Sequence, residues 1–94
     1  MKRRVRLTSV ANRDLVRLID YLDVRSPSAA LRAYDALDAA IRSLEEFSER
    51  ARPGPEPGTR ELIVPLGSGA YIVRYRVNAD EVVVGRIFHG REDR

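Results

Sequence analysis

The sequence predicts a single α+β domain over residues 1–94, in which a helical hairpin packs on a mainly antiparallel sheet in the order β-α-α-β-β-β. Two long segments in the first half carry apolar residues at helical spacing. The last third alternates apolar and polar residues with the period of a strand. Between them, residues 51–58 hold three prolines and two glycines, which predicts a loop. A chain of 94 residues is the size of one small domain, so a second domain is not expected.

A short strand is predicted at the start of the chain, over residues 4–8. Val5 and Leu7 alternate there with arginines, so we expect the two apolar side chains to face the core. Thr8 or Ser9 then supplies the side-chain oxygen that caps the following helix.

The first helix is predicted over residues 10–24. We expect Asp14 and Arg17 to lie on its solvent side. Its apolar stripe consists of Leu15, Leu18, Ile19 and Leu22.

The second helix is predicted over residues 27–50. Ser26 is its expected N-cap, and Pro27 fits the first turn, where a missing N–H costs nothing. The connection between the two helices is short, which predicts an antiparallel hairpin. The second apolar stripe consists of Ala30, Tyr34, Leu37, Ile41 and Leu44.

Three strands of a meander are predicted in the last third of the chain. They cover residues 59–65, 70–77 and 81–89, joined by turns at 66–69 and 78–80, and a polar, loose tail follows over 90–94. In the middle strand Tyr71 and Tyr75 lie on the face that we expect to meet the helices. Arg74 and Arg76 then share the opposite, open face.

Composition excludes several classes of site. There is no cysteine and only one histidine, so neither a disulfide nor a zinc centre is expected, and no cofactor is predicted. No apolar run approaches the roughly 20 residues that span a bilayer. The basic N-terminus lacks the apolar segment of a secretory signal, so a cytoplasmic location without membrane contact is expected.

The arginines are the strongest functional candidates. The net charge is only +3, yet nearly all basic residues are arginine, which binds phosphate and carboxylate in a bidentate way. Arg74 and Arg76 on an open sheet face suit a phosphate backbone or a carboxylate-rich partner, and the alternative is a solvated sheet face. The strand half carries Arg60, Arg74, Arg76 and Arg86.

His89, at the end of the last predicted strand, is a candidate general acid or base for RNA cleavage, with Glu61 as a second proton-transfer group. The alternative for His89 is a structural hydrogen bond. Aromatic residues do not strengthen the nucleic-acid interpretation, because the pattern places none on the open face. All four tyrosines are predicted to pack in the core: Tyr21, Tyr34, Tyr71 and Tyr75.

Four segments together resemble the RelE/ParE toxins of bacterial type II toxin–antitoxin modules. They read LTxxAxxDL over residues 7–15, PGTRELIVP over 57–65, YIVRYRV over 71–77 and VVVGRIFHGR over 82–91. The likeness extends over nearly the whole chain and is specific because the elements occur in the family's order and spacing.

The resemblance implies one of two activities. RelE-like members cut mRNA in the ribosomal A site, whereas ParE-like members poison DNA gyrase without that catalytic set. Here Gly90 follows His89 where ribonuclease members often place an aromatic, and no lysine-rich stretch precedes residue 59. Both departures favour the ParE-like interpretation. If the chain is a ribonuclease instead, the matching catalytic residues are Glu61, Arg74, Arg86 and His89.

The leading interpretation is therefore a bacterial toxin, not itself an enzyme, that inhibits DNA gyrase, replication and growth. The resemblance implies a cognate ParD-like antitoxin that neutralises it in a hetero-oligomer, docking on the helical hairpin or the open sheet face. The alternatives are a ribosome-dependent mRNA endoribonuclease and a degenerate member that only titrates an antitoxin. The residues expected to bind target or antitoxin are Arg60, Arg74, Arg76, Arg86, His89 and Arg91.

Overall fold

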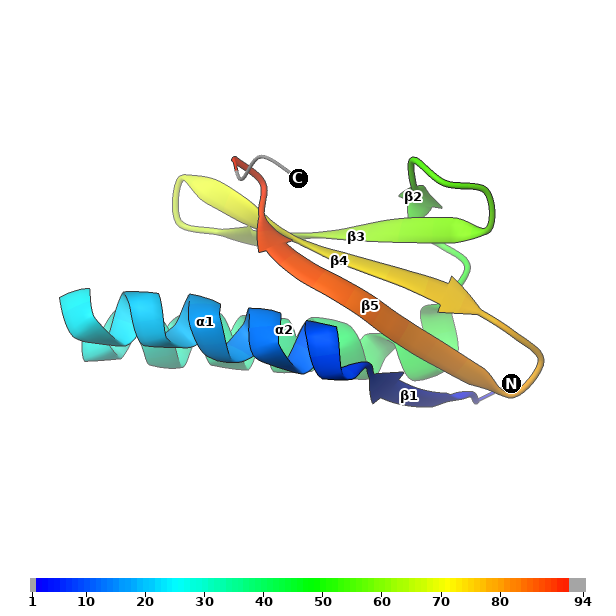
Figure 1. Ribbon diagram of the computed structural model, residues 1–94, viewed down its shortest axis with the longest axis horizontal. Helices are drawn as coiled ribbons and strands as arrows, with labels where there is room; N and C mark the ends of the chain where they lie inside the picture. Colours follow the sequence, from blue (N-terminus) through cyan, green and yellow to red (C-terminus); the bar gives the residue numbers. More distant parts are fainter. Residues whose placement is uncertain (1, 92–94) are drawn as a thin grey trace.

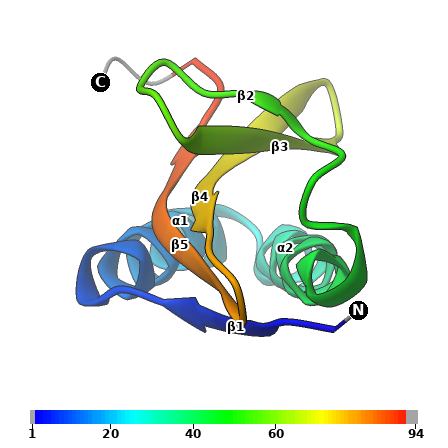
Figure 2. The ribbon, with the colours of Figure 1, turned by 90° about the vertical axis from the view of Figure 1, so that its right-hand side faces the viewer.

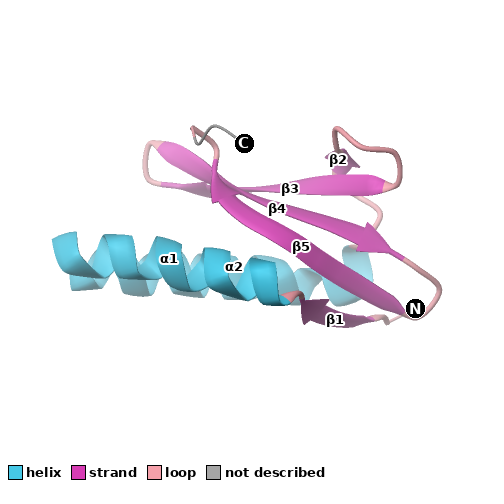
Figure 3. Ribbon diagram, viewed as in Figure 1, coloured by secondary structure: helices cyan, strands magenta, loops and turns pink. Residues whose placement is uncertain are grey.

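The computed structural model describes residues 2–91, which form two helices packed on one face of a five-stranded sheet (Figures 1 and 3). The strand order is β1-β5-β4-β3-β2, with β1 parallel to β5 and every other pair antiparallel. The predicted α+β class and mainly antiparallel sheet are confirmed. The elements are β1 (Arg4–Leu7), α1 (Ser9–Arg25), α2 (Pro27–Phe47), β2 (Arg52–Pro53), β3 (Thr59–Leu66), β4 (Gly69–Val77) and β5 (Glu81–His89). Part of the predicted loose tail, residues 92–94, lies outside the described residues.

Side-chain caps define the helical hairpin as predicted. The Thr8 hydroxyl accepts a hydrogen bond from the Ala11 N–H at 3.1 Å and starts α1. Ser26 ends α1 by donating its N–H to the Leu22 carbonyl, and it starts α2 by accepting from the Ala29 N–H. A single residue therefore closes one helix and opens the next, which leaves α1 and α2 side by side (Figure 2).

Helix α2 ends at Phe47, three residues before the predicted end. The next residue, Ser48, is buried, and its carbonyl accepts a 2.6 Å hydrogen bond from the Tyr75 hydroxyl. Burial raises the pKa of Tyr75, so the phenol keeps the proton that it donates. A contact from β4 thus replaces the last turn of helix, and no local pattern in the sequence signals it.

The loop predicted over 51–58 contains the short strand β2, which the sequence analysis missed. Arg52 pairs with Glu61 and Pro53 with Arg60. A two-residue strand ending in proline offers no alternating pattern to detect, and proline is tolerated because β2 is an edge strand.

The core lies between the helices and the sheet. Small helix residues, Ala11 and Ala33, are fully buried and let the helices approach the strands closely. Large side chains from both layers fill the space between them, including Leu37, Leu44 and Ile87. Val5 and Leu7 pack against this core as predicted.

The prediction for the tyrosines is confirmed for two and wrong for two. Tyr71 and Tyr75 are buried, but Tyr21 is 58% exposed and Tyr34 is 47% exposed. Both exposed tyrosines lie on the helices, which the sheet covers on one side only, so residues at the margin of each stripe remain in solvent (Figure 2).

No helix within residues 2–91 is long and apolar enough to cross a membrane.

A β-bulge in β5 decides which side chains face the helices. Arg74 pairs with Arg86 but the next residue, Tyr75, pairs with Val84, so Gly85 has no partner in β4. Before the bulge Val84 faces the core, and after it the core-facing residue is Ile87.

Asp14 accepts hydrogen bonds from the edge of β5 beyond this bulge. Strand β1 pairs with β5 only as far as Val84, so the later edge groups of β5 lack a β1 partner. The Asp14 carboxylate accepts from the Ile87 N–H at 2.9 Å and from Arg86 Nε at 2.8 Å. Asp14 is only 6% exposed, so the prediction that it lies on the solvent side was wrong.

We predict that Asp14→Ala lowers the free energy of unfolding by about 2 kcal/mol or more, because it leaves the buried Ile87 N–H without an acceptor and removes the partner of Arg86. Urea denaturation followed by circular dichroism measures the change. Asp20→Ala, at an exposed position of the same helix, is the matched control and is expected to shift stability by less than about 0.5 kcal/mol. Equal stability of the two variants would contradict the role of Asp14.

Candidate functional site

A row of charged side chains crosses the open face of the sheet. Cross-strand register places Glu61 beside Arg74 and Arg74 beside Arg86, while β2 brings Arg52 next to Glu61. Residues directly opposite each other in a sheet share a face. These four side chains therefore project from the face of the sheet that points away from the helices. The predicted set of Glu61, Arg74, Arg86 and His89 is brought together here except for His89, and Arg52 was not predicted.

Glu61 is the centre of this row. It is 6% exposed, and Arg74 donates to one of its carboxylate oxygens through Nε at 2.9 Å while Arg52 donates to the other at 3.1 Å. Burial raises the pKa of this carboxyl, but the hydrogen bonds and charges of Arg74 and Arg52 outweigh burial and hold the pKa below its ordinary value. Glu61 is therefore an ionised, occupied carboxylate and a weak proton acceptor.

Arg76 shares the open face with Arg74, as predicted, and it is the more accessible of the two. The side chain of Arg76 is 56% exposed, whereas that of Arg74 is 19% exposed. Arg76 donates to the Pro57 carbonyl at 3.1 Å and lies 3.6 Å from the Glu56 carboxylate. Surface contacts of this kind are weak, so a partner can compete for the Arg76 guanidinium.

An aromatic residue also lies on the open face, against the prediction that there is none. Phe88 pairs with Ile72, two residues before Arg74, and the Arg74 guanidinium carbon lies 5.1 Å from the Phe88 ring centre. The bulge at Gly85 moves Phe88 to this side. Because Phe88 is only 1% exposed, its ring packs against the Arg74 guanidinium and offers no stacking surface to a base.

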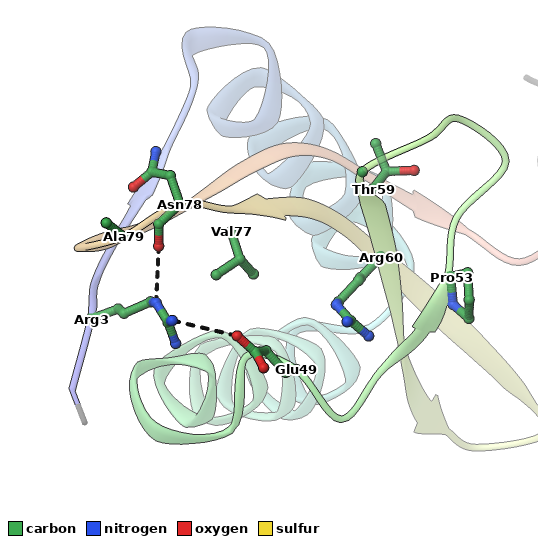
Figure 4. Close-up of a pocket in the computed structure, with 9 residues that line it drawn as sticks. Arg3, Glu49, Pro53, Thr59, Arg60, Val77, Asn78 and Ala79 are labelled. Atoms are coloured by element: carbon green, nitrogen blue, oxygen red, sulfur yellow. Dashed lines mark hydrogen bonds and ion pairs between the residues drawn. The ribbon is translucent and has the colours of Figure 1, made fainter.

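Arg60 lies on the other side of the sheet from Arg74 and Arg76, because successive residues of β3 alternate between faces. Its guanidinium donates to the Ala51 carbonyl at 2.9 Å. It borders a cavity of about 540 Å³ between the end of α2 and the β4–β5 turn, across from Arg3 and Glu49 (Figure 4). Arg3 is held there by Asn78 and Glu49. The structure therefore separates Arg60 from the other predicted arginines.

His89 faces the helices and does not join the arginine row. Its ring meets the Tyr71 ring edge to face, with centres 5.3 Å apart, and its Nδ1 accepts from the Arg91 N–H at 3.1 Å. The neutral ring therefore carries its proton on Nε2. Within the described part of the chain, no group of three acidic or histidine residues is placed to hold a metal ion.

His89 and Arg91 border two adjoining cavities of about 570 Å³ and 290 Å³, which share four lining residues. We call this space the tip groove, because it lies between the α1–α2 connection and the far end of the sheet. The shared residues are Leu22, Tyr71, His89 and Arg91. Arg17, Tyr21 and Arg32 also line the tip groove and were not predicted as site residues. Their positions at the margins of the helical stripes were the only available signal.

The fold and its arginine-bearing sheet define a small basic α+β domain with two distinct polar surfaces. Comparison with known proteins then identifies the family. The family described as the ParE toxin of type II toxin–antitoxin systems, parDE, matches residues 5–94. The chain therefore belongs to this family of the ParE/RelE superfamily.

Two curated proteins and one solved structure support the assignment, and a second solved structure shares the fold. Toxin RelE1 of Caulobacter vibrioides is 46% identical over 84 residues, covering 89% of each chain, and toxin RelE3 of the same organism is 40% identical, covering 96% of this chain and 97% of its own. A chain of the chromosomal ParDE system of P. aeruginosa superposes with a TM-score of 0.80 at 25% identity, covering 94% and 96%. The RelBE2 toxin–antitoxin complex of Mycobacterium tuberculosis shows the same fold, with a TM-score of 0.63 at 24% identity and coverage of 95% and 99%.

We predict that Glu61→Gln destabilises the protein at neutral pH by about 1–3 kcal/mol, because it removes the carboxylate that Arg74 and Arg52 share. The folded pKa of Glu61 lies below its ordinary value of 4.5, so its ionised form contributes fully above that value. The contribution is lost as pH falls through the folded pKa. Urea titrations of both proteins at neutral and acidic pH should show the gap closing at acidic pH, and a gap that stays constant would contradict this account.

Proposed function

We propose that this toxin acts in the manner of ParE, binding DNA gyrase and blocking replication, and that a ParD-like antitoxin neutralises it in a hetero-oligomer. One observation carries the proposal. The residues that a ribonuclease would use are not assembled at one point, since His89 lies on the helix side of the sheet and Arg74 on the open side. Glu61 is bound by two arginines and has a lowered pKa, which suits a structural role better than proton abstraction.

The open sheet face supplies the proposed contact with gyrase or its bound DNA. Arg76 is its most accessible predicted arginine, with Arg52 nearby on β2. Guanidinium groups on a sheet suit the phosphates of DNA or the carboxylates of a protein surface. Binding of this kind inhibits an enzyme without any bond breaking by the toxin.

A supercoiling assay tests the proposal directly. It contains purified toxin, DNA gyrase, ATP and relaxed plasmid, with and without antitoxin. We expect loss of supercoiling, accumulation of gyrase-cleaved linear DNA, and reversal by the antitoxin. Normal supercoiling in the presence of a toxin that still stops growth would overturn the proposal.

The names of the two Caulobacter relatives, RelE1 and RelE3, keep ribosome-dependent mRNA cleavage as the second candidate. That activity requires Arg86 and His89 to act in cleavage on the ribosome. A translation reaction with defined mRNA separates the two candidates, because only the ribonuclease leaves cut mRNA, and we expect that cleavage to fall in His89→Ala and Arg86→Ala.

We predict that Arg76→Glu reduces gyrase inhibition at least about tenfold, because it reverses an exposed charge of the proposed contact surface. The fold is expected to survive, since Arg76 makes only surface contacts. Arg13→Glu, at an exposed position of α1, is the matched control and should inhibit like the wild type. Inhibition curves from the supercoiling assay measure both, and full activity of Arg76→Glu would contradict the assignment.

Arg74 needs a different design because it also holds Glu61. Arg74→Gln combined with Glu61→Gln removes both charges and leaves no buried carboxylate unpaired. We expect this double variant to fold and to inhibit gyrase less than Glu61→Gln alone. Equal inhibition by the two variants would limit Arg74 to a structural role.

A further inference from the structure

The cavity of about 540 Å³ beside Arg60, which we call the Arg60 cavity, is separate from both polar surfaces described above. Its walls come from the N-terminal segment, the residues that follow α2, β2, the start of β3 and the β4–β5 turn (Figure 4). None of its lining residues belongs to the arginine row or to the tip groove. Its volume falls within the range of about 300–1,000 Å³ that small-molecule sites occupy.

Arg60 is a half-buried cation without a carboxylate partner. Its guanidinium donates to a backbone carbonyl at 2.9 Å, and within residues 2–91 no ion pair joins it to an aspartate or glutamate. The other two half-buried arginines of this range each have one, since Arg74 pairs with Glu61 and Arg3 with Glu49. A guanidinium withdrawn from water without a counter-charge loses solvation that the fold does not replace. The cavity therefore favours an anion beside Arg60.

Both arginines of the Arg60 cavity are held in place by groups of the toxin itself. Arg3 donates through Nε to the Asn78 carbonyl and through Nη1 to the Ser48 hydroxyl, each at 3.0 Å. The Ala51 carbonyl holds Arg60. A guanidinium has five N–H donors, so both arginines keep donors for a ligand after these bonds. Donors that are fixed in advance lose less side-chain entropy when a ligand binds.

Glu49 lies between these two arginines (Figure 4). Among the described residues it is the one acid that lines the cavity. Its carboxylate is 3.4 Å from Arg3 Nη2, and its side chain is 64% exposed. An ion pair this long and this exposed is weak, so an incoming anion can displace Glu49 from Arg3. Glu49 is therefore expected to compete with an anionic ligand, and Arg60 to attract it.

The rest of the lining suits a ligand with an organic group rather than a bare ion. Val77, Pro53 and Ala79 contribute hydrocarbon to the walls. An inorganic anion would leave most of the space of about 540 Å³ unfilled. Phosphate carries more charge and more acceptor oxygens than one carboxylate, so it is the better match for guanidinium groups that approach from two sides (Figure 4).

We propose that the Arg60 cavity binds a small phosphate monoester, with its phosphate between Arg3 and Arg60 and its organic group against Val77 and Pro53. Binding displaces Glu49 from Arg3. Nucleotides and sugar phosphates are two sources of this chemistry. The site is separate from the proposed gyrase contact, because Arg60 and the arginine row lie on opposite faces of the sheet.

Calorimetric titration of the purified toxin tests the proposal with adenosine 5′-monophosphate, glucose 6-phosphate, inorganic phosphate and adenosine. We expect at least one monoester to bind about tenfold or more tightly than inorganic phosphate, because its organic group contacts the hydrocarbon walls. The tighter of the two monoesters identifies a nucleotide or a sugar phosphate as the source. No binding of either monoester at about 10 mM would overturn the proposal. So would equal affinity for adenosine or for inorganic phosphate.

Two single variants should change the affinity for the monoester in opposite directions. Arg60→Gln removes the unpaired cation and is expected to weaken binding at least about tenfold. Glu49→Gln removes the competing carboxylate and is expected to tighten binding about threefold. The matched controls, Arg13→Gln and Glu46→Gln, change exposed helix positions outside the cavity and should stay within about twofold of wild type. Unchanged affinity of Arg60→Gln, or unchanged or weaker binding by Glu49→Gln, would contradict the proposed site.

Thermal unfolding of each variant without ligand guards against loss of fold. If Arg60→Gln unfolds, the comparison of Glu49→Gln with Glu46→Gln still tests the site, because the Glu49 side chain lies mostly in solvent. Binding is measured without gyrase or antitoxin, so its result is independent of the proposed target.

Discussion

The arrangement of both polar surfaces depends on one change of register, the bulge at Gly85 in β5. Without it, strict alternation would place Arg86 and Phe88 on the same side as Val82 and Val84, beneath the helices. With it, Ile87 enters the core, and Arg86 and Phe88 move to the open face. The bulge disrupts the ladder beside the point where β1 ends, and Asp14 supplies the acceptor that the sheet lacks there.

Pairing with carboxylates explains why a chain rich in arginine leaves only small clusters of arginine side chains exposed. Arg74 and Arg52 share Glu61, and Arg86 is held by Asp14, so these guanidinium groups support buried or half-buried carboxylates. Replacing one partner of such a pair leaves the other charge poorly solvated, which is why these positions are structurally costly to change. Arg76 lies 3.6 Å from the exposed Glu56 carboxylate, a weaker contact, and is the guanidinium group of the open face that is best placed for recognition.

Local patterns predicted every helix and strand except β2, placed the end of α2 too late, and were insufficient for the site. Alternation in β4 correctly placed Arg74 and Arg76 on the same face of the sheet. Thr8 and Ser26 cap the helices as their side-chain chemistry predicts. The errors arose where tertiary contacts override local signals. Asp14 resembles an ordinary surface aspartate until the edge of β5 is placed beside it. Arg60 and His89 were grouped with the arginines of the open face, although both lie on the helix side of the sheet. The sequence shows that these residues belong to strands, but it does not show which face of the sheet each side chain occupies.

The tip of the helical hairpin is where this domain covers its own apolar surface least. Val24 is 84% exposed and Leu31 is 67% exposed, close in sequence to the residues that line the tip groove. In a domain of 94 residues the hydrophobic core is modest, so apolar side chains left in water forgo stabilisation that folding alone does not recover. A partner that binds only the folded toxin recovers part of it and stabilises the toxin in proportion to the logarithm of its concentration over Kd. The same contacts that neutralise the toxin would then also stabilise its fold, which couples the folded lifetime of the toxin to the supply of its partner.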